Sequence, residues 1–258
     1  MILPSFVVLG QERSGTTLVQ TLLNSHQDLL CRGELFDPWQ IDDNGQKITD
    51  LSLVRARDAL PKAFLTAAMD GADLAKPAPS RISRFAAKLT RGKRKRIGFK
   101  MLTHHHPLLF KEIIPASPDM AIIYVTRTNK LAQFASRQQV KETGRWTEAR
   151  AQAPVAPKLK ISPFWAAAEC NRLENEDFLL SHYLEMLPNP VLQLEYASLS
   201  EGDLQAELVA FLDVSAQGLS SPLKKQGQNR VLDRFQNADE IATHFAAIER
   251  EAWLGPEI

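Results

Sequence analysis

The 258-residue sequence has few of the residues that mark specialised protein classes. Its two cysteines, Cys31 and Cys170, lie far apart without a metal or redox spacing, which argues against a secreted disulfide scaffold. With 31 Lys and Arg against 30 Asp and Glu, the formal net charge is only +1, which argues against bulk nucleic-acid binding. No apolar run approaches the roughly 20 residues of a membrane span, and no signal-peptide pattern is present. We therefore expect a globular, cytoplasmic protein without a transmembrane segment.

Short apolar, β-branched segments alternate along the chain with helical patterns. The segments that predict strands are 5–9, 97–102, 120–125 and 191–196, and the helical patterns cover 16–23, 51–70, 130–143, 164–187 and 204–212. Such alternation predicts an α/β fold, a P-loop-like parallel sheet flanked by helices on both faces. Because no linker divides the chain, we expect a single domain over residues 1–258. It would carry a variable helical insertion at about 40–96 and a proline-containing loop or lid at about 146–163.

The loop between the first strand and the first helix predicts an anion site. It reads Gly10–Gln11–Glu12–Arg13–Ser14–Gly15–Thr16–Thr17. Backbone N–H groups and the helix dipole favour a negative group there, and Arg13 adds a cation. Kinases and nucleotide hydrolases with a P-loop need lysine after the second glycine, where this chain has Thr16. The loop therefore favours a compact anion over a magnesium-bound triphosphate, and we expect no metal site.

Two motifs resemble those of the sulfotransferases that use 3′-phosphoadenosine 5′-phosphosulfate. Arg13–Thr17 after an apolar strand resembles the 5′-phosphosulfate loop, and Arg127 followed nine residues later by Ser136 resembles the motif that holds the 3′-phosphate. That interval is similar to bacterial carbohydrate sulfotransferases, typified by trehalose 2-sulfotransferase and by rhizobial nodulation-factor and lipopolysaccharide enzymes. The resemblance implies transfer of a sulfuryl group from this donor to a hydroxyl of a carbohydrate or glycolipid.

The same resemblance implies which residues bind the donor. A further segment, Pro222–Gln226, resembles a basic loop that closes over the nucleotide in the bacterial enzymes. The implied donor contacts are Gln11, Glu12, Arg13, Ser14, Gly15, Thr16, Thr17, Arg127, Ser136, Lys224, Lys225 and Gln226. Arg13 would also stabilise charge on the departing phosphate.

The acceptor hydroxyl needs a general base, and two candidates compete for this role. Glu34 falls after the first helix, where the resemblance implies a Gly-Glu motif whose carboxylate serves as the base in the trehalose enzyme. The run His104–His105–His106 follows the strand that carries Lys100, and histidine titrates near working pH. Glu34 is the preferred base, with His104 and His105 as rivals. Lys100 could reach the sulfuryl oxygens, or, as an alternating strand residue, it could equally point to solvent or pair with an acid. Sulfuryl transfer can be stabilised by fixed cations and donors without a metal.

The acceptor and the partners are less determined by the sequence. Trp39, Trp146 and Trp165 are candidate platforms for a sugar ring or adenine, although core packing competes with that role. The basic run Arg91–Arg96 is interpreted as a solvated connector, with contact to an anionic substrate or a glycolipid-bearing membrane as the alternative. A homodimer stays open, since no coiled-coil pattern supports it. Two rival functions remain, a P-loop kinase or hydrolase and a non-catalytic donor-binding module.

Overall fold

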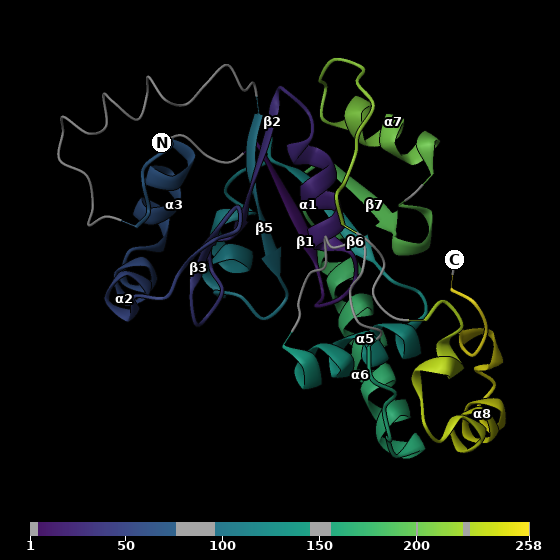
Figure 1. Ribbon diagram of the computed structural model, residues 1–258. Helices are drawn as coiled ribbons and strands as arrows, with labels where there is room; N and C mark the ends of the chain where they lie inside the picture. Colours follow the sequence, from purple (N-terminus) through teal and green to yellow (C-terminus); the bar gives the residue numbers. More distant parts are fainter. Residues whose placement is uncertain (1–4, 76–95, 145–155, 200, 224–227, 258) are drawn as a thin grey trace.

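The computed structural model describes residues 5–75, 96–144, 156–199, 201–223 and 228–257 (Figure 1). A five-stranded sheet forms its centre, in the order β2-β5-β1-β6-β7, and every pairing within it is parallel. The strands are β1 (Phe6–Gly10), β2 (Leu29–Glu34), β5 (Arg96–Leu102), β6 (Ala121–Thr126) and β7 (Val191–Glu195). The predicted parallel sheet is thus confirmed, and β2 is a strand that the sequence analysis missed.

Helices cover both faces of the sheet, as predicted. They are α1 (Thr16–Asn24), α2 (Leu51–Ala59), α3 (Pro61–Met69), α5 (Lys130–Thr143), α6 (Pro163–Glu185), α7 (Gly202–Phe211) and α8 (Ala238–Ala247). Alternate residues of β1 face opposite sides, because successive strand side chains point in opposite directions. Val7 and Leu9 belong to a core with α3 and the end of α6, whereas Phe6 and Val8 pack with α1 and α7.

The segment between β2 and β5 differs in detail from the single predicted helix at 51–70. A hairpin of β3 (Ile41–Asp43) and β4 (Gln46–Ile48) comes first, turning at an Asn-Gly pair of the kind that favours tight hairpins. The helical part is then split into α2 and α3 at Leu60, because the residue before a proline is disfavoured in helical conformation. In Figure 1 the hairpin, α2 and α3 lie beyond the β2 edge of the sheet.

The remaining elements are short helical turns. A π-helical turn covers Leu109–Ile113, and three short 3-10 turns cover Tyr196–Ser198, Val231–Arg234 and Glu251–Trp253. Together with α5, α6 and α8, the last two turns enclose a third apolar cluster. Most of the predicted lid and of the basic run Arg91–Arg96 lies outside the described residues. In the parts of the chain that are described, no helix has the length and apolar content to cross a bilayer.

Candidate active site

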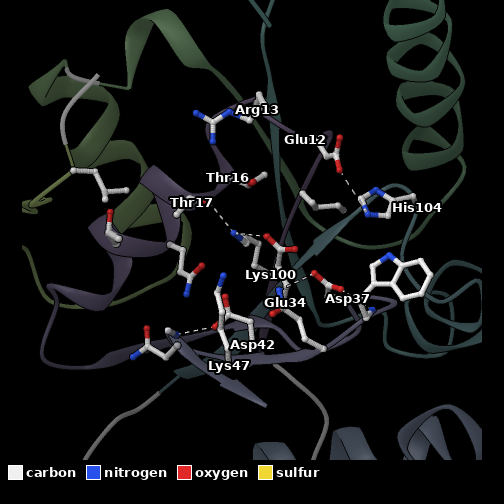
Figure 2. A pocket seen from close by; sticks show the side chains of 18 residues that line it. Glu12, Arg13, Thr16, Thr17, Glu34, Asp37, Asp42, Lys47, Lys100 and His104 are labelled. Atoms are coloured by element: carbon white, nitrogen blue, oxygen red, sulfur yellow. Dashed lines mark hydrogen bonds and ion pairs between the residues drawn. The ribbon is translucent and has the colours of Figure 1, made fainter. Parts of the chain in front are cut away.

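A cavity of about 630 Å³ opens where β1, β2 and β5 end (Figure 2). Its wall is formed by Glu12, Arg13, Thr16, Thr17, Gln20, Thr21, Glu34, Asp37, Trp39, Gln40, Asp42, Asn44, Gly45, Lys47, Lys100, Leu102, His104 and Leu223. Parallel register brings Gly10 of β1 beside Leu102 of β5, so the loop after β1 and the histidines after β5 meet at one edge. Ligands of open α/β sheets bind at this carboxyl edge.

The loop between β1 and α1 is a tight turn that depends on two glycines. Gly15 has φ +107°, and a Cβ there would lie 2.8 Å from the ring of Tyr196. A Cβ on Gly10 would lie 2.6 Å from the Ser14 hydroxyl oxygen and 2.7 Å from the Val125 carbonyl oxygen. Arg13 itself has φ +63°, an uncommon conformation for a residue other than glycine. Close packing of the loop on its surroundings therefore excludes side chains at both glycines.

Two buried glutamines, Gln11 and Gln133, attach this loop to the protein interior. The Gln11 side chain donates to the Leu173 carbonyl at 2.8 Å and accepts from Gln133 Nε2 at 3.0 Å. Gln133 Nε2 also donates to the Glu12 carbonyl at 2.9 Å. The side chain of Gln11 is thus committed to the interior, and that of Ser14 is 1% exposed and donates to the Gln11 carbonyl. Of the predicted donor contacts in this loop, the four that line the cavity are Glu12, Arg13, Thr16 and Thr17.

Arg13 joins the two predicted donor motifs. Its Nε donates to the Ser136 hydroxyl of α5 at 3.0 Å. Burial, reinforced by the nearby charge of Arg127, lowers the pKa of Arg13 to about 10. The guanidinium is therefore still protonated at neutral pH, and it lies at the cavity wall (Figure 2).

Arg127 pairs with a carboxylate of the protein itself. Its Nη2 donates to Glu257 Oε2 at 2.8 Å, its Nε donates to the other carboxylate oxygen, and its Nη1 donates to the Arg13 carbonyl at 2.8 Å. A second buried guanidinium, that of Arg234, reaches the same carboxylate at 3.1 Å. The Arg127 guanidinium also lies 4.3 Å from the centre of the Tyr196 ring. Neither Arg127 nor Ser136 belongs to the cavity wall.

Glu257 and Arg234 were missed by the sequence analysis. Glu257 lies 130 residues beyond Arg127, and its carboxylate is 3% exposed. A lone glutamate at such a distance carries no motif, so no local signal pointed to this pairing.

Lys100 of β5 links the loop between β1 and α1, called the anion loop after its predicted role, to the predicted base. Its Nζ donates to the Thr17 hydroxyl at 2.8 Å and lies 2.8 Å from Glu34 Oε1, as the dashed lines in Figure 2 show. The lysine side chain is 4% exposed and the glutamate side chain 20% exposed. Burial opposes ionisation of Glu34, yet the hydrogen bond from His105 and the charge of Lys100 prevail and lower its pKa to about 2. Glu34 is therefore a carboxylate at neutral pH, but a weak base in this arrangement.

The three consecutive histidines have different surroundings. The His105 side chain is fully buried, its Nδ1 accepts from the Leu102 N–H at 3.2 Å, and its Nε2 lies 3.4 Å from Glu34 Oε2. Burial lowers the pKa of His105 despite the neighbouring carboxylate, so the ring is neutral at pH 7, and because Nδ1 accepts, its proton is on Nε2, beside Glu34. His104 lines the cavity with 46% of its side chain exposed, and its Nε2 lies 4.0 Å from Glu12 Oε1. His106 Nδ1 accepts from the Leu108 N–H.

Polar side chains from residues 37–47 form the wall opposite the anion loop. They are Asp37, Gln40, Asp42, Asn44 and Lys47, and Trp39 stands beside them with 79% of its surface exposed. Burial raises the pKa of Asp42. Gly33 lets the hairpin approach β2, since a Cβ there would lie 2.6 Å from the Asp42 carbonyl oxygen. Apart from Trp39, the sequence analysis missed this wall, although the Asn-Gly turn was a usable signal for the hairpin.

Other predicted residues are not at this cavity. Trp165 packs edge-on against Phe134, with ring centres 5.3 Å apart, and 43% of its surface is exposed. Lys224, Lys225 and Gln226, together with Trp146, lie outside the described residues.

Comparison with known proteins places the chain in a family. A family model described as "Sulfotransferase family" matches residues 4–202. Nodulation protein H of Rhizobium meliloti strain 1021 is 23% identical over 245 residues, covering 93% of this chain and 91% of that protein. Nodulation protein H of Rhizobium tropici is 24% identical over 247 residues, covering 93% and 89%.

Similar solved structures have low sequence identity. A sulfotransferase from Alicyclobacillus acidocaldarius superposes with a TM-score of 0.47 at 14% identity, covering 98% of this chain and 99% of that one. The sulfotransferase domain from the curacin biosynthetic pathway superposes with a TM-score of 0.44 at 16% identity, covering 98% and 90%.

Proposed function

The chain belongs to the sulfotransferase family, and from this we propose that it moves a sulfuryl group from 3′-phosphoadenosine 5′-phosphosulfate to a hydroxyl of a carbohydrate or glycolipid. The observation that carries the proposal is Lys100, which touches both the anion loop at Thr17 and the carboxylate of Glu34. Anion loop, cation and base thus meet at one cavity. Membership of this family favours transfer over the rival P-loop kinase or hydrolase. Cytoplasmic location, membrane contact and a homodimer stay predictions.

The donor's phosphosulfate binds, in this proposal, at the start of α1. The first N–H groups of a helix and its dipole attract an anion, and the hydroxyls of Thr16 and Thr17 line the cavity there. Arg13 and Lys100 flank these hydroxyls with positive charge (Figure 2). Fixed donors and cations of this kind stabilise charge that develops during transfer without reorganising.

Lys100 makes the basicity of Glu34 depend on the donor. Without the donor, the ammonium is shared by Glu34 and Thr17 and keeps the pKa of the carboxyl at about 2. An anionic sulfuryl group beside Thr17 competes for the same ammonium, which weakens its pairing with Glu34. The pKa of Glu34 then rises toward its ordinary value, because an opposite charge that moves away no longer favours the ionised form. Glu34 becomes a better base when the donor is in place.

The transfer itself exchanges one S–O bond for another. The acceptor oxygen forms a bond to sulfur while the bond from sulfur to the donor's 5′-phosphate oxygen breaks. The acceptor proton passes to Glu34, and Arg13 stabilises the charge left on 3′-phosphoadenosine 5′-phosphate. The His105 Nε2–H directed at Glu34 fixes the orientation of the carboxylate.

The donor's 3′-phosphate has to compete with Glu257. The proposal assigns this phosphate to Arg127 and Ser136, but the Nε and Nη2 of Arg127 both donate to the Glu257 carboxylate. A phosphate cannot occupy the same edge of the guanidinium as a bidentate carboxylate. Donor binding through Arg127 therefore requires Glu257 to leave that edge.

The acceptor wall suits a polyhydroxyl compound. Carboxylates and amides exchange hydrogen bonds with sugar hydroxyls, and the exposed Trp39 presents an aromatic face beside them. The relatives named Nodulation protein H add support for transfer, since their family is the same.

A transfer assay with labelled donor and a panel of neutral disaccharides tests the proposal. The wild-type protein is expected to label a disaccharide, and Arg13→Ala is expected to abolish labelling. Arg172→Ala is a matched control, because Arg172 pairs with Glu176 on the surface of α6. Near-normal turnover of Arg13→Ala would contradict the role of Arg13. Donor binding without labelling of any acceptor would favour a non-catalytic module, and tight magnesium-dependent ATP binding would favour a kinase.

A further inference from the structure

One buried side chain, Arg57 of α2, holds the loop Leu35–Gln40. Arg57 is 2% exposed, and its Nη1 donates to the carbonyl oxygens of Leu35 at 3.1 Å, Asp37 at 2.7 Å and Gln40 at 2.9 Å. Three carbonyls spread over six residues thus converge on one nitrogen. The path of the loop between its two ends is set by this single guanidinium.

The rest of the Arg57 side chain is also fixed. Its Nε donates to Asp58 Oδ1 at 2.8 Å, and its guanidinium carbon lies 5.7 Å from the centre of the Phe36 ring. A buried cation is costly unless it is paired and hydrogen-bonded, and here Asp58 pairs with Nε while three carbonyls accept from Nη1. Arg57 and Val54 are the buried residues of α2. Contact with the loop is therefore a principal attachment of this helix to the protein.

The loop held in this way carries part of the cavity wall. Asp37, Trp39 and Gln40 all line the cavity. The Asp37 carboxylate accepts from the Trp39 N–H at 2.8 Å and from Gln40 Nε2 at 3.1 Å, which ties the three residues together. An exposed indole beside a fixed carboxylate offers an apolar face and a hydrogen-bond acceptor to the same ligand.

We infer that Leu35–Gln40 is the acceptor-recognition loop and that Arg57 is the positioning residue that holds it, an inference that rests on the proposed transfer. The ligand class that fits is a neutral ring bearing hydroxyls, with one face on Trp39 and a hydroxyl on Asp37. The charge of this wall does not favour an anionic acceptor, because Asp37 and Asp42 stand there with a single cation, Lys47. The anion loop lies on the other wall, so donor binding does not depend on Arg57.

The test measures acceptor KM and donor Kd separately. Arg57→Met is expected to raise the KM for the best disaccharide about tenfold and to leave the Kd for 3′-phosphoadenosine 5′-phosphate within about twofold. The acceptor KM of Arg57→Lys is expected to lie between those of the wild type and of Arg57→Met, since an ammonium restores a charged donor without the planar fork. Arg55→Met is the matched control, because Arg55 is exposed on the same helix.

A second variant separates positioning from loss of folding. Trp39→Ala changes an exposed residue, and it is expected to raise the acceptor KM without lowering the melting temperature. If Arg57 acts through the loop, Arg57→Met combined with Trp39→Ala raises KM by less than the product of the single effects, because coupled residues are not additive. A KM increase in the double variant equal to the product of the two single increases would overturn the positioning role.

The remaining outcomes are equally decisive. A wild-type acceptor KM in Trp39→Ala, or a donor Kd that shifts as much as the acceptor KM in Arg57→Met, would overturn the inference while leaving the transfer intact. A wild-type protein that labels no acceptor would overturn the proposed function, and the inference with it.

Discussion

Replacement of Glu34 by glutamine tests the electrostatics of the site most directly. The substitution keeps the shape of the side chain and removes the charge that Lys100 and the His105 ring stabilise. The pKa of Glu34 lies at about 2 in the folded protein against an ordinary 4.5. A shift of this size corresponds to about 3 kcal/mol of stability at neutral pH.

The direction of the pH dependence follows from the lowered pKa. A carboxyl that ionises more readily when folded stabilises the protein fully above the pKa of the unfolded chain, and this contribution is lost as the pH falls toward 2. About 2 kcal/mol of the contribution from Glu34 is therefore lost between pH 7 and pH 3. Glu34→Gln has no carboxyl at this position and does not show this loss. The difference in unfolding free energy between the wild type and Glu34→Gln therefore shrinks by the same amount from pH 7 to pH 3.

Urea unfolding of both proteins at a series of pH values from 3 to 7 measures this difference. Glu112→Gln is the control, because Glu112 is half exposed and pairs with Lys62 on the surface, where such a pair contributes less than about 1 kcal/mol. Because Glu34 is the proposed base, Glu34→Gln should also lower kcat by about 10²–10⁴-fold while donor affinity is retained. A difference in unfolding free energy that stays constant from pH 7 to pH 3 would refute the lowered pKa, and near-normal kcat would refute the base.

Three further predictions concern neighbouring residues. Lys100→Met should lower kcat by about 10²-fold and shift the acid limb of the kcat/KM profile to higher pH, because the carboxylate beside it loses its cation; an unshifted limb would exclude the link between them. Glu257→Gln should lower the melting temperature, since two buried guanidiniums lose a shared anion, and tighten binding of 3′-phosphoadenosine 5′-phosphate in calorimetry. Unchanged affinity would mean that the nucleotide does not use the Arg127 edge. His104→Ala should retain kcat within about tenfold, whereas a loss above about 10²-fold would identify His104 as the base.

The central strands were predictable because their signal is local. β1, β5 and β6 each contain a short run of apolar residues, which is typical of parallel strands covered on both faces, whereas the edge strand β7 alternates buried and exposed residues. The edge strand β2 contains Arg32, Gly33 and Glu34 and lacks that pattern. Its polar residues are accommodated by partners elsewhere, such as the ion pair of Arg32 with Asp43 in the hairpin. The strand propensity of single residues does not indicate such ion pairs between distant segments.

The sequence by itself indicated the family and the parallel sheet, and it predicted an anion site in the loop between β1 and α1. Gly10, Arg13 and Gly15 are close neighbours in the chain, so the motif that they form can be recognised without knowledge of the fold. Only the tertiary structure decided which side chains meet. Lys100 reaches Thr17 across 83 residues because β1, which leads into α1, lies beside β5 in parallel register. Arg127 reaches Glu257 across 130 residues because the C-terminal segment packs against the residues that follow β6. The low pKa of Glu34, which burial opposes, and the occupied edge of Arg127 arise from these long-range contacts, which a linear pattern does not contain.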